Sequence, residues 1–200
     1  MRVTRGIPAA TASPAALTIG NFDGVHLGHQ AMLAELKRVA GRLAVPACVL
    51  TFEPHPREFF APDKAPTRLT SLREKLELLA ACGVDQAHIC RFNYPFAQTT
   101  ADDFIEHIVA RGLGARAVLV GDDFRFGARR AGSVAMLKQA GPRLGFEVTA
   151  LESVVLDGER VSSTALRQAL AAGDLERAQQ LLGRPYSISG RVVRGDELGR

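Results

Sequence analysis

The sequence has no long hydrophobic run, few cysteines and no concentrated stretch of positive charge. No apolar run approaches the roughly 20 residues that a transmembrane helix needs, and the first residues show no apolar segment of a secretory signal. We therefore expect no membrane partner. The three cysteines, Cys48, Cys82 and Cys90, are odd in number and lack the spacing of a metal site, which favours free thiols in a reducing, cytoplasmic environment.

The charge distribution argues against a nucleic-acid partner. The net charge of +4 arises from lysines and arginines interspersed with acidic residues, without the basic stripe that is typical of nucleic-acid-binding proteins. This balance is compatible with small anionic ligands such as nucleotides. A hydrophobic content of 46% in 200 residues is enough for the core of one ordinary domain, and nothing in the sequence specifies an oligomeric state.

Strand-like and helix-like segments alternate along the chain. Strands are expected at 16–19, 47–52, 86–92, 115–120 and 146–151. Helices are expected at 29–40, 71–83, 100–111 and 133–140, and from about Ser163 and Asp174, with glycines such as Gly41 ending them. The alternation predicts an α/β fold: a Rossmann-like, doubly wound parallel sheet with ligands bound beyond the carboxyl ends of its strands.

Three segments fall outside this alternation. Residues 53–70 are rich in proline and charge and predict a long loop, and Asp157-Gly158 predicts a hairpin turn. After Arg184-Pro185 the pattern changes, and residues 186–193 alternate like a strand. We therefore expect one domain over residues 1–184 and the start of a second, β-rich domain over residues 185–200. In the helix that Ser71 is expected to cap, Leu72, Leu76 and Leu79 should face inward.

The most informative motif is His26-Leu27-Gly28-His29, preceded by Gly20-Asn21-Phe22-Asp23-Gly24 at the end of the first expected strand. Backbone N–H groups at a helix start, with two imidazoles on one helix face, form a site for a polyphosphate. Gly28 has no Cβ, so phosphates can approach the backbone. The alternatives are a metal pair or two surface histidines. A metal pair would need a third ligand, and Asp23 is the only nearby candidate.

A second motif, Gly-Asp-Asp-Phe-Arg-Phe-Gly at 121–127, directly follows the fourth expected strand. Its acidic residues, Asp122 and Asp123, could orient a ribose or a metal-bound water; the alternative is a turn with one capping aspartate. Phe124 and Phe126 alternate, so one can face the core and the other a ligand pocket.

A third motif, Arg-Val-Ser-Ser-Thr-Ala-Leu-Arg at 160–167, opens a helix. Hydroxyl groups at a helix start can cap free N–H groups or bind phosphate, and Arg160 and Arg167 add positive charge. Taken alone the motif is typical of an ordinary helix start. Beside a triphosphate site it predicts a second phosphate-binding element.

A fourth motif, Thr-Phe-Glu-Pro-His-Pro-Arg-Glu-Phe-Phe at 51–60, follows the second expected strand. Its prolines stiffen the loop, and Phe52 or Phe60 would suit a planar ring as stacking partners. The alternative is a rigid connector whose phenylalanines face the core.

In this order, the four motifs resemble the bacterial bifunctional riboflavin kinase/FMN adenylyltransferases, also called FAD synthetases. The H-x-G-H element alone indicates only the wider nucleotidyltransferase superfamily, and the other three motifs narrow the resemblance. Gly-Arg-Pro-Tyr at 183–186 and Gly-Arg-Val-Val-Arg-Gly at 190–195 are similar to the start of that family's riboflavin kinase domain. The catalytic part of a kinase domain is not in this sequence, so the resemblance assigns no kinase activity to it.

The resemblance implies a transferase that joins AMP from ATP to FMN, giving FAD and pyrophosphate, with Mg²⁺ entering with ATP and no metal site of the protein's own. The implied catalytic residues are Asn21, His26, His29, Asp123 and Arg167. The implied ATP- and flavin-binding residues are Gly20, Phe22, Asp23, Gly24, Gly28, Phe52, His55, Pro56, Phe60, Phe126, Arg160, Ser163 and Thr164. Two alternatives stay open: a related nucleotidyltransferase with a non-flavin acceptor, and a nucleotide-binding module without catalysis.

Overall fold

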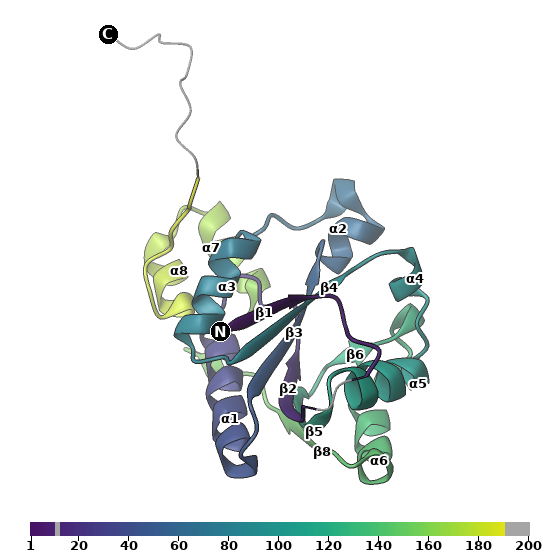
Figure 1. Cartoon of the computed structure of the whole chain (residues 1–200). Coiled ribbons are helices and arrows are strands. Elements are labelled where there is room, and N and C mark those ends of the chain that lie inside the picture. The colour runs from purple at the N-terminus through teal and green to yellow at the C-terminus, as the bar shows by residue number, and fades with distance from the viewer. Residues whose placement is uncertain (11–12, 191–200) are drawn as a thin grey trace, which may run out of the picture.

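The computed structural model describes residues 1–10 and 13–190, and a six-stranded parallel sheet forms its centre (Figure 1). The strand order is β1-β4-β3-β2-β5-β8, and every neighbouring pair is parallel. The strands are β1 (Arg2–Arg5), β2 (Ala15–Ile19), β3 (Ala47–Glu53), β4 (Gln86–Arg91), β5 (Ala115–Gly121) and β8 (Glu147–Leu151). The chain builds outward from β2 in both directions, so the order reverses between β2 and β5, where ligands of such sheets bind.

Helices cover both faces of the sheet, which confirms the predicted doubly wound α/β fold (Figure 1). One face packs against α1 (Leu27–Leu43) and α3 (Leu72–Ala81), and the other against the π-helix η2 (Phe104–Gly112) and α6 (Val134–Leu144). A third cluster joins α7 (Ser163–Ala171) to α8 (Leu175–Leu182). The shorter elements are α2 (Pro56–Phe60), η1 (Pro62–Lys64), α4 (Tyr94–Ala97), α5 (Ala101–Asp103), η3 (Ala128–Arg130), β6 (Arg125–Phe126), β7 (Gly132–Ser133), β9 (Val155–Leu156) and β10 (Glu159–Arg160).

Strand β1 is the one strand of the central sheet that the sequence analysis did not predict. Its sequence Arg-Val-Thr-Arg carries no buried residue, and even Val3 is 45% exposed. The strand forms because its backbone pairs with the edge of β4, from Arg2 opposite Gln86 to Arg5 opposite Ile89. An edge strand of this kind leaves no hydrophobic signal in the sequence.

The prediction that Gly41 ends the first helix is wrong. Helix α1 begins at Leu27, directly after its N-cap His26, and continues through Gly41 to Leu43. Ala44 ends it in the left-handed conformation (φ 52°), where its N–H donates to the carbonyls of Ala40 and Gly41. Glycine inside a helix costs only about 1 kcal/mol relative to alanine, so an exposed position tolerates it.

The segment 53–70 is not a structureless loop, because α2 and η1 interrupt it. The predicted capping box of Ser71 and Glu74 opens α3. The inward face of α3 differs from the prediction: Lys75 and Leu79 are buried, whereas Leu72 and Leu76 are half-buried.

The later predictions are mostly confirmed. Thr100 caps its helix, Asp157 and Gly158 turn the β9–β10 hairpin, and Gly183 ends α8 in the left-handed conformation. Residues 185–190 form no strand, and residues 191–193 of the strand expected there lie outside the described residues. In the described part of the chain, no helix has the length and hydrophobicity to cross a membrane.

Candidate nucleotide-binding site

The loop that joins β2 to α1 (residues 20–26, the β2–α1 loop) lies where the strand order reverses. Gly24 has a φ of 84°, and Phe22 and Val25 have positive φ angles of 49° and 42°, a region that residues other than glycine rarely adopt. Both of these side chains are 1% exposed and anchor the loop in the core. The packing of two apolar side chains thus fixes a backbone shape that brings His26 to the start of α1.

His26 and His29 stack on each other at the start of α1. Their ring centroids are 3.7 Å apart with an interplanar angle of 18°, and the Phe22 ring lies 5.0 Å from that of His29. The backbone N–H of His29 donates to Nδ1 of His26 over 3.4 Å. A Cβ on Gly28 would lie 3.2 Å from the His26 ring and 3.4 Å from the Val161 carbonyl oxygen, so Gly28 also makes room for the stacked pair.

Both histidines are neutral near neutral pH. Burial, with help from the charge of Arg160, lowers the pKa of His26 to about 4. Burial and the neighbouring His26 hold the pKa of His29 well below its usual value. Since Nδ1 of His26 accepts a hydrogen bond, its proton is on Nε2, which is left as a donor.

Two buried polar atoms beside the histidines have no partner among the described residues. They are Oδ1 of Asn21 and Nδ1 of His29. A buried polar atom without a partner costs about 1–3 kcal/mol, and such atoms in folded proteins are rare. Their presence in one loop, next to a helix N-terminus, indicates that a polar ligand completes the site.

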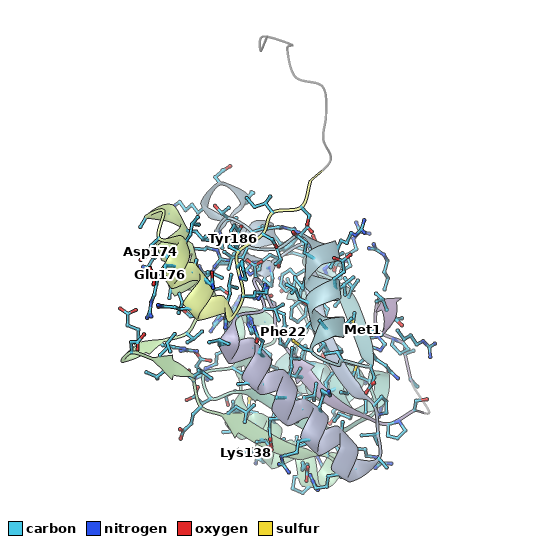
Figure 2. All side chains as sticks on the ribbon, turned by 90° about the vertical axis from the view of Figure 1, so that its left-hand side faces the viewer. Met1, Phe22, Lys138, Asp174, Glu176 and Tyr186 are labelled. Carbon is cyan, nitrogen blue, oxygen red and sulfur yellow. The ribbon has the colours of Figure 1, made fainter. Side chains whose placement is uncertain are left out.

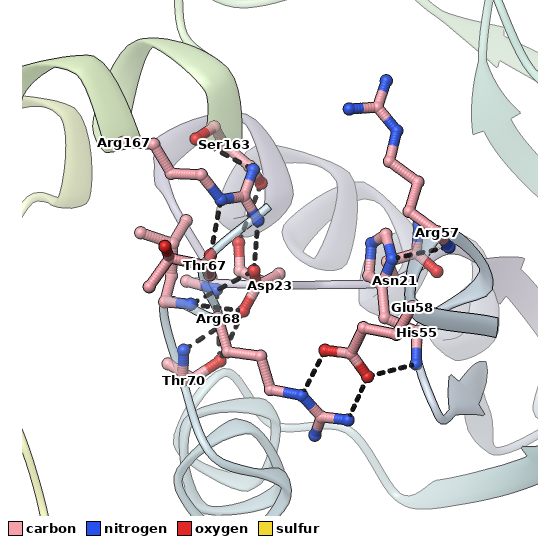
Figure 3. A network of polar contacts seen from close by, with 12 residues as sticks. Asn21, Asp23, His55, Arg57, Glu58, Thr67, Arg68, Thr70, Ser163 and Arg167 are labelled. Carbon is pink, nitrogen blue, oxygen red and sulfur yellow. Dashed lines mark hydrogen bonds and ion pairs between the residues drawn. The ribbon is translucent and has the colours of Figure 1, made fainter. Parts of the chain in front are cut away.

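Asp23 holds three parts of the molecule together (Figure 3). Its buried carboxylate accepts hydrogen bonds from the backbone N–H groups of Leu69 (3.0 Å) and Thr70 (3.1 Å) and forms an ion pair with Arg167. Its backbone carbonyl accepts a hydrogen bond from the Ser163 hydroxyl over 2.9 Å. The polar atoms of Asp23 are therefore bonded within the protein. Such contacts suit a residue that positions others better than one that binds a nucleotide directly.

The second and third motifs meet through one exposed ion pair. Arg160 and Asp123 are joined by an N–O distance of 2.8 Å, with side chains 55% and 61% exposed. The hydroxyl that caps α7 belongs to Ser162, which the sequence analysis did not single out, while Thr164 is exposed in the first turn. The start of α7 thus places the exposed Thr164 close in sequence to this ion pair.

The segment between β3 and α3 (residues 54–71, the β3–α3 loop) is fixed by a second set of polar contacts. His55 caps α2, with its Nδ1 accepting from the N–H of Arg57 over 3.1 Å, and Pro56 occupies the first turn. Burial lowers the pKa of His55. Arg68 pairs with Glu58 (Figure 3) and also with Glu53, which ties the ends of the loop together.

Aromatic side chains gather beside this loop. Phe60 is 66% exposed, and its ring lies 5.2 Å from that of Phe59 and 5.6 Å from that of Phe92. Phe52 also contacts Phe92, at 6.0 Å. The sequence analysis did not single out Phe59, which lies in α2, or Phe92, which directly follows β4.

Phe126 does not join this aromatic group. It is 6% exposed, packs on Phe104 with a centroid distance of 5.1 Å and stacks on Phe124 at 5.5 Å. Of the two alternating phenylalanines, Phe126 is therefore the one that faces the core, and Phe124 is half-buried.

The structure adds two cationic residues that were not site candidates, although Arg184 belongs to the Gly-Arg-Pro-Tyr segment at 183–186. Lys75 of α3 is only 5% exposed. Arg184, directly after α8, donates to the carbonyl oxygens of Gly24 (2.8 Å) and Val25 (3.1 Å) and so holds the β2–α1 loop from outside. Isolated cations in helices or after them resemble ordinary surface residues in a sequence, so no signal marked either one.

Comparison with known proteins agrees with this geometry. The sequence model of the FAD synthetase family matches residues 9–165. The chain is 50% identical over 203 residues to the bifunctional riboflavin kinase/FMN adenylyltransferase of Escherichia coli strain K12, covering 100% of this chain and 65% of that protein. It is 47% identical to the protein of the same name from Haemophilus influenzae, covering 100% of this chain and 66% of that one. The chain thus spans about two thirds of these relatives' length.

A solved structure gives the same fold. A protein from Streptococcus pneumoniae, described as a macrolide-efflux protein, superposes with a TM-score of 0.80 at 26% identity, covering 93% of this chain and 63% of that one. The family match includes the β2–α1 loop, the β3–α3 loop and the start of α7. The chain belongs to the FAD synthetase family.

Proposed function

We propose that this chain is an FMN adenylyltransferase, which transfers AMP from ATP to the phosphate of FMN and releases pyrophosphate. The observation that carries the proposal is the start of α1, where two neutral stacked imidazoles lie beside two buried, unpartnered polar atoms at the switch point of the sheet. The family match and the names of the relatives support FMN as the acceptor.

The nucleotide phosphates would lie against the start of α1. The first backbone N–H groups of a helix have no partner within it and attract anions, and α1 is a long helix of 17 residues. Nε2–H of His26 would donate to a phosphate oxygen from a fixed position, without a change of protonation. Arg160, Ser163 and Thr164 at the start of α7 would form the second phosphate-binding element, and Arg167 would be held in place by Asp23.

The chemistry needs little acid–base help from the protein. The FMN phosphate is already ionised, so one of its oxygens can attack the α-phosphorus of ATP in line while pyrophosphate leaves. The protein's contribution is positioning and stabilisation of the charge on the phosphoryl oxygens. Mg²⁺ would arrive with ATP and neutralise phosphate charge; among the described residues, no group of three His, Cys, Asp or Glu could hold a metal.

The flavin would lie on the side of the β3–α3 loop. Phe60 is exposed and available for stacking, and Phe52 lies behind it in the same aromatic group. His55 and Pro56 would act by fixing α2, which carries Phe60. Phe126 would support the site from the core.

The proposal is tested by incubating the purified chain with ATP, Mg²⁺ and a panel of phosphorylated acceptors, and measuring pyrophosphate and FAD. FMN is expected to be the preferred acceptor, and riboflavin, which lacks the nucleophilic phosphate, should give no product. His29→Ala should lose at least about tenfold of the rate, since removing one charge-stabilising donor typically costs about 10²–10³. Circular dichroism of both proteins controls for folding.

Preference for a non-flavin acceptor would contradict the proposal and favour a related nucleotidyltransferase. Tight ATP binding without turnover at saturating FMN would favour a module that has lost catalysis. We take residues 1–184 as the catalytic domain, because α8 ends at Leu182, and residues 185–200 as leading toward a riboflavin kinase domain. The three cysteines are unpaired, which suits a cytoplasmic reaction.

A further inference from the structure

Three arginines around the site are already paired with carboxylates. The pairs are Arg167 with Asp23, Arg160 with Asp123, and Arg68 with both Glu53 and Glu58. The two histidines of α1 are neutral. The arginines of the four motifs that have no carboxylate partner in the described part of the chain, Arg57 and Arg125, are exposed, so these motifs offer little unpaired positive charge inside a site built for two phosphorylated ligands.

Lys75 is the exception. It lies on the inward face of α3, is only 5% exposed, and makes no hydrogen bond or ion pair within residues 1–10 and 13–190. Its Nζ is not among the fully buried polar atoms, so the ammonium group keeps some contact with solvent. Partial burial of a charge without a partner is still costly and lowers the pKa of Lys75. A chain that only needed to fill this position could use leucine or methionine at no such cost.

The titratable neighbours of Lys75 come from both parts of the site, the start of α1 and the β3–α3 loop. Its charge acts on His29 of α1 and on His55 of the β3–α3 loop. The other charged groups that act on it are Asp23, Glu53, Glu58 and Arg68. The carboxylates among them lie beyond ion-pair distance and are held by arginines. The two loops are joined just before α3, where Thr70 binds the Asp23 carboxylate and the N–H of Gly24. Lys75 lies near the start of α3 and is therefore close to this junction.

We propose that Lys75 binds a phosphate group of a ligand at the junction of these two loops. This inference rests on the proposed function and adds to it a cation that contacts the phosphates. The phosphate could belong to the nucleotide or to the flavin, because the junction adjoins both of their expected positions. In either case an anionic oxygen would supply the partner that Lys75 lacks in the free protein.

The test compares ligands that differ only in their phosphates. Equilibrium binding of ATP, adenosine, FMN and riboflavin is measured for the wild type, Lys75→Met, Lys75→Arg and the control Lys138→Met. Lys138 is an exposed lysine of α6, near the opposite end of the molecule from Tyr186 (Figure 2), and its replacement removes the same charge.

Lys75→Met should weaken binding of ATP or FMN by about tenfold or more, the usual effect of losing a hydrogen bond to a charged group. Binding of adenosine and riboflavin should change little, and Lys75→Arg should retain most of the affinity. Two ratios of affinity are compared, that of ATP to adenosine and that of FMN to riboflavin. The ratio that falls in Lys75→Met identifies which phosphate Lys75 binds. Lys138→Met should leave both ratios unchanged.

Thermal unfolding provides a second measurement, in which Lys75→Met should not be less stable than the wild type. Because Lys75→Met removes an unpaired buried charge and keeps the apolar stem, its Tm should equal or exceed that of the wild type. A purely structural lysine would instead lower the Tm on replacement and leave both binding ratios unchanged, which would overturn the inference. If Lys75→Met does not fold, Lys75→Gln takes its place. Failure of the wild type to bind ATP at all would reject the proposed function itself.

Discussion

Replacement of Asp23 by asparagine should destabilise the protein strongly, although it changes one oxygen to nitrogen. The Asp23 carboxylate is 6% exposed and binds Leu69, Thr70 and Arg167, whose side chain is 20% exposed. In Asp23→Asn one amide oxygen can still accept from the backbone of Leu69 and Thr70. Arg167 then faces an NH₂ group and becomes a buried cation without its partner.

The expected size follows from this burial. Removing one partner of a buried ion pair costs about 3–5 kcal/mol, because the other charge stays behind in a poorly solvated place. Since Arg167 retains some contact with solvent, we expect a loss near the lower end, about 3 kcal/mol. For a domain of this size about 1 kcal/mol shifts the Tm by about 2–4 °C, so the Tm should fall by about 6–12 °C.

The matched control is Asp123→Asn, which breaks the exposed pair with Arg160 by the same chemical change. Exposed pairs contribute about 0–1 kcal/mol, so the Tm of this variant should stay within about 4 °C of the wild type. Circular dichroism melts of both variants and of Arg167→Met give the comparison, and a double-mutant cycle isolates the Asp23–Arg167 coupling. Equal Tm values for Asp23→Asn and Asp123→Asn would refute the argument that the buried Asp23–Arg167 pair stabilises the fold more than the exposed Asp123–Arg160 pair does.

Three further results are expected. Burial lowers the pKa of His26 to about 4, so between pH 4 and 6.5 the unfolded chain binds more protons than the folded one. The free energy of unfolding should therefore rise with pH across this window, by about 2 kcal/mol from pH 5 to 6.5. Urea unfolding at each pH measures this rise, which should be smaller in His26→Asn. Phe60→Ala should raise the KM for FMN several-fold and leave the KM for ATP and the Tm nearly unchanged, since this side chain is 66% exposed; equal changes in both KM values would contradict a flavin contact. Arg184→Met should weaken ATP binding through the loss of its hydrogen bonds to Gly24 and Val25, and an unchanged Kd by calorimetry would show that these contacts do not shape the loop.

The sequence predicted the fold well where hydrophobic periodicity marks it. Buried strands such as β3 and β5 and the H-x-G-H motif after β2 were located within a few residues. Strand β1 was missed because an edge strand held only by backbone pairing to β4 needs no apolar residue. Gly41 was misjudged because glycine ends a helix only where the chain needs a left-handed residue, and Ala44 supplies it here.

The site was predicted less completely, since a motif shows which residues are close in sequence but not which are paired in space. Arg160, Asp123 and Arg167 all matched motifs, but the structure joins the first two to each other and the third to Asp23. The alternation of Phe124 and Phe126 left open which one faces the core, and packing on Phe104 decides it. Long-range partners of this kind are outside the reach of local patterns.

Lys75 shows why the remaining part of the site escaped notice. The leucines of α3 predicted an inward face through Leu72, Leu76 and Leu79. Leu79 is buried as expected and Leu72 and Leu76 are half-buried, but Lys75, at helical spacing on the same face, is buried as well. A lysine at an inward helical position contradicts the amphipathic rule and, in sequence alone, is taken as a solvated residue. Such violations persist in folded proteins chiefly where function requires them. The presence of a buried lysine on the leucine face of α3 is therefore itself an argument that Lys75 is kept for a ligand.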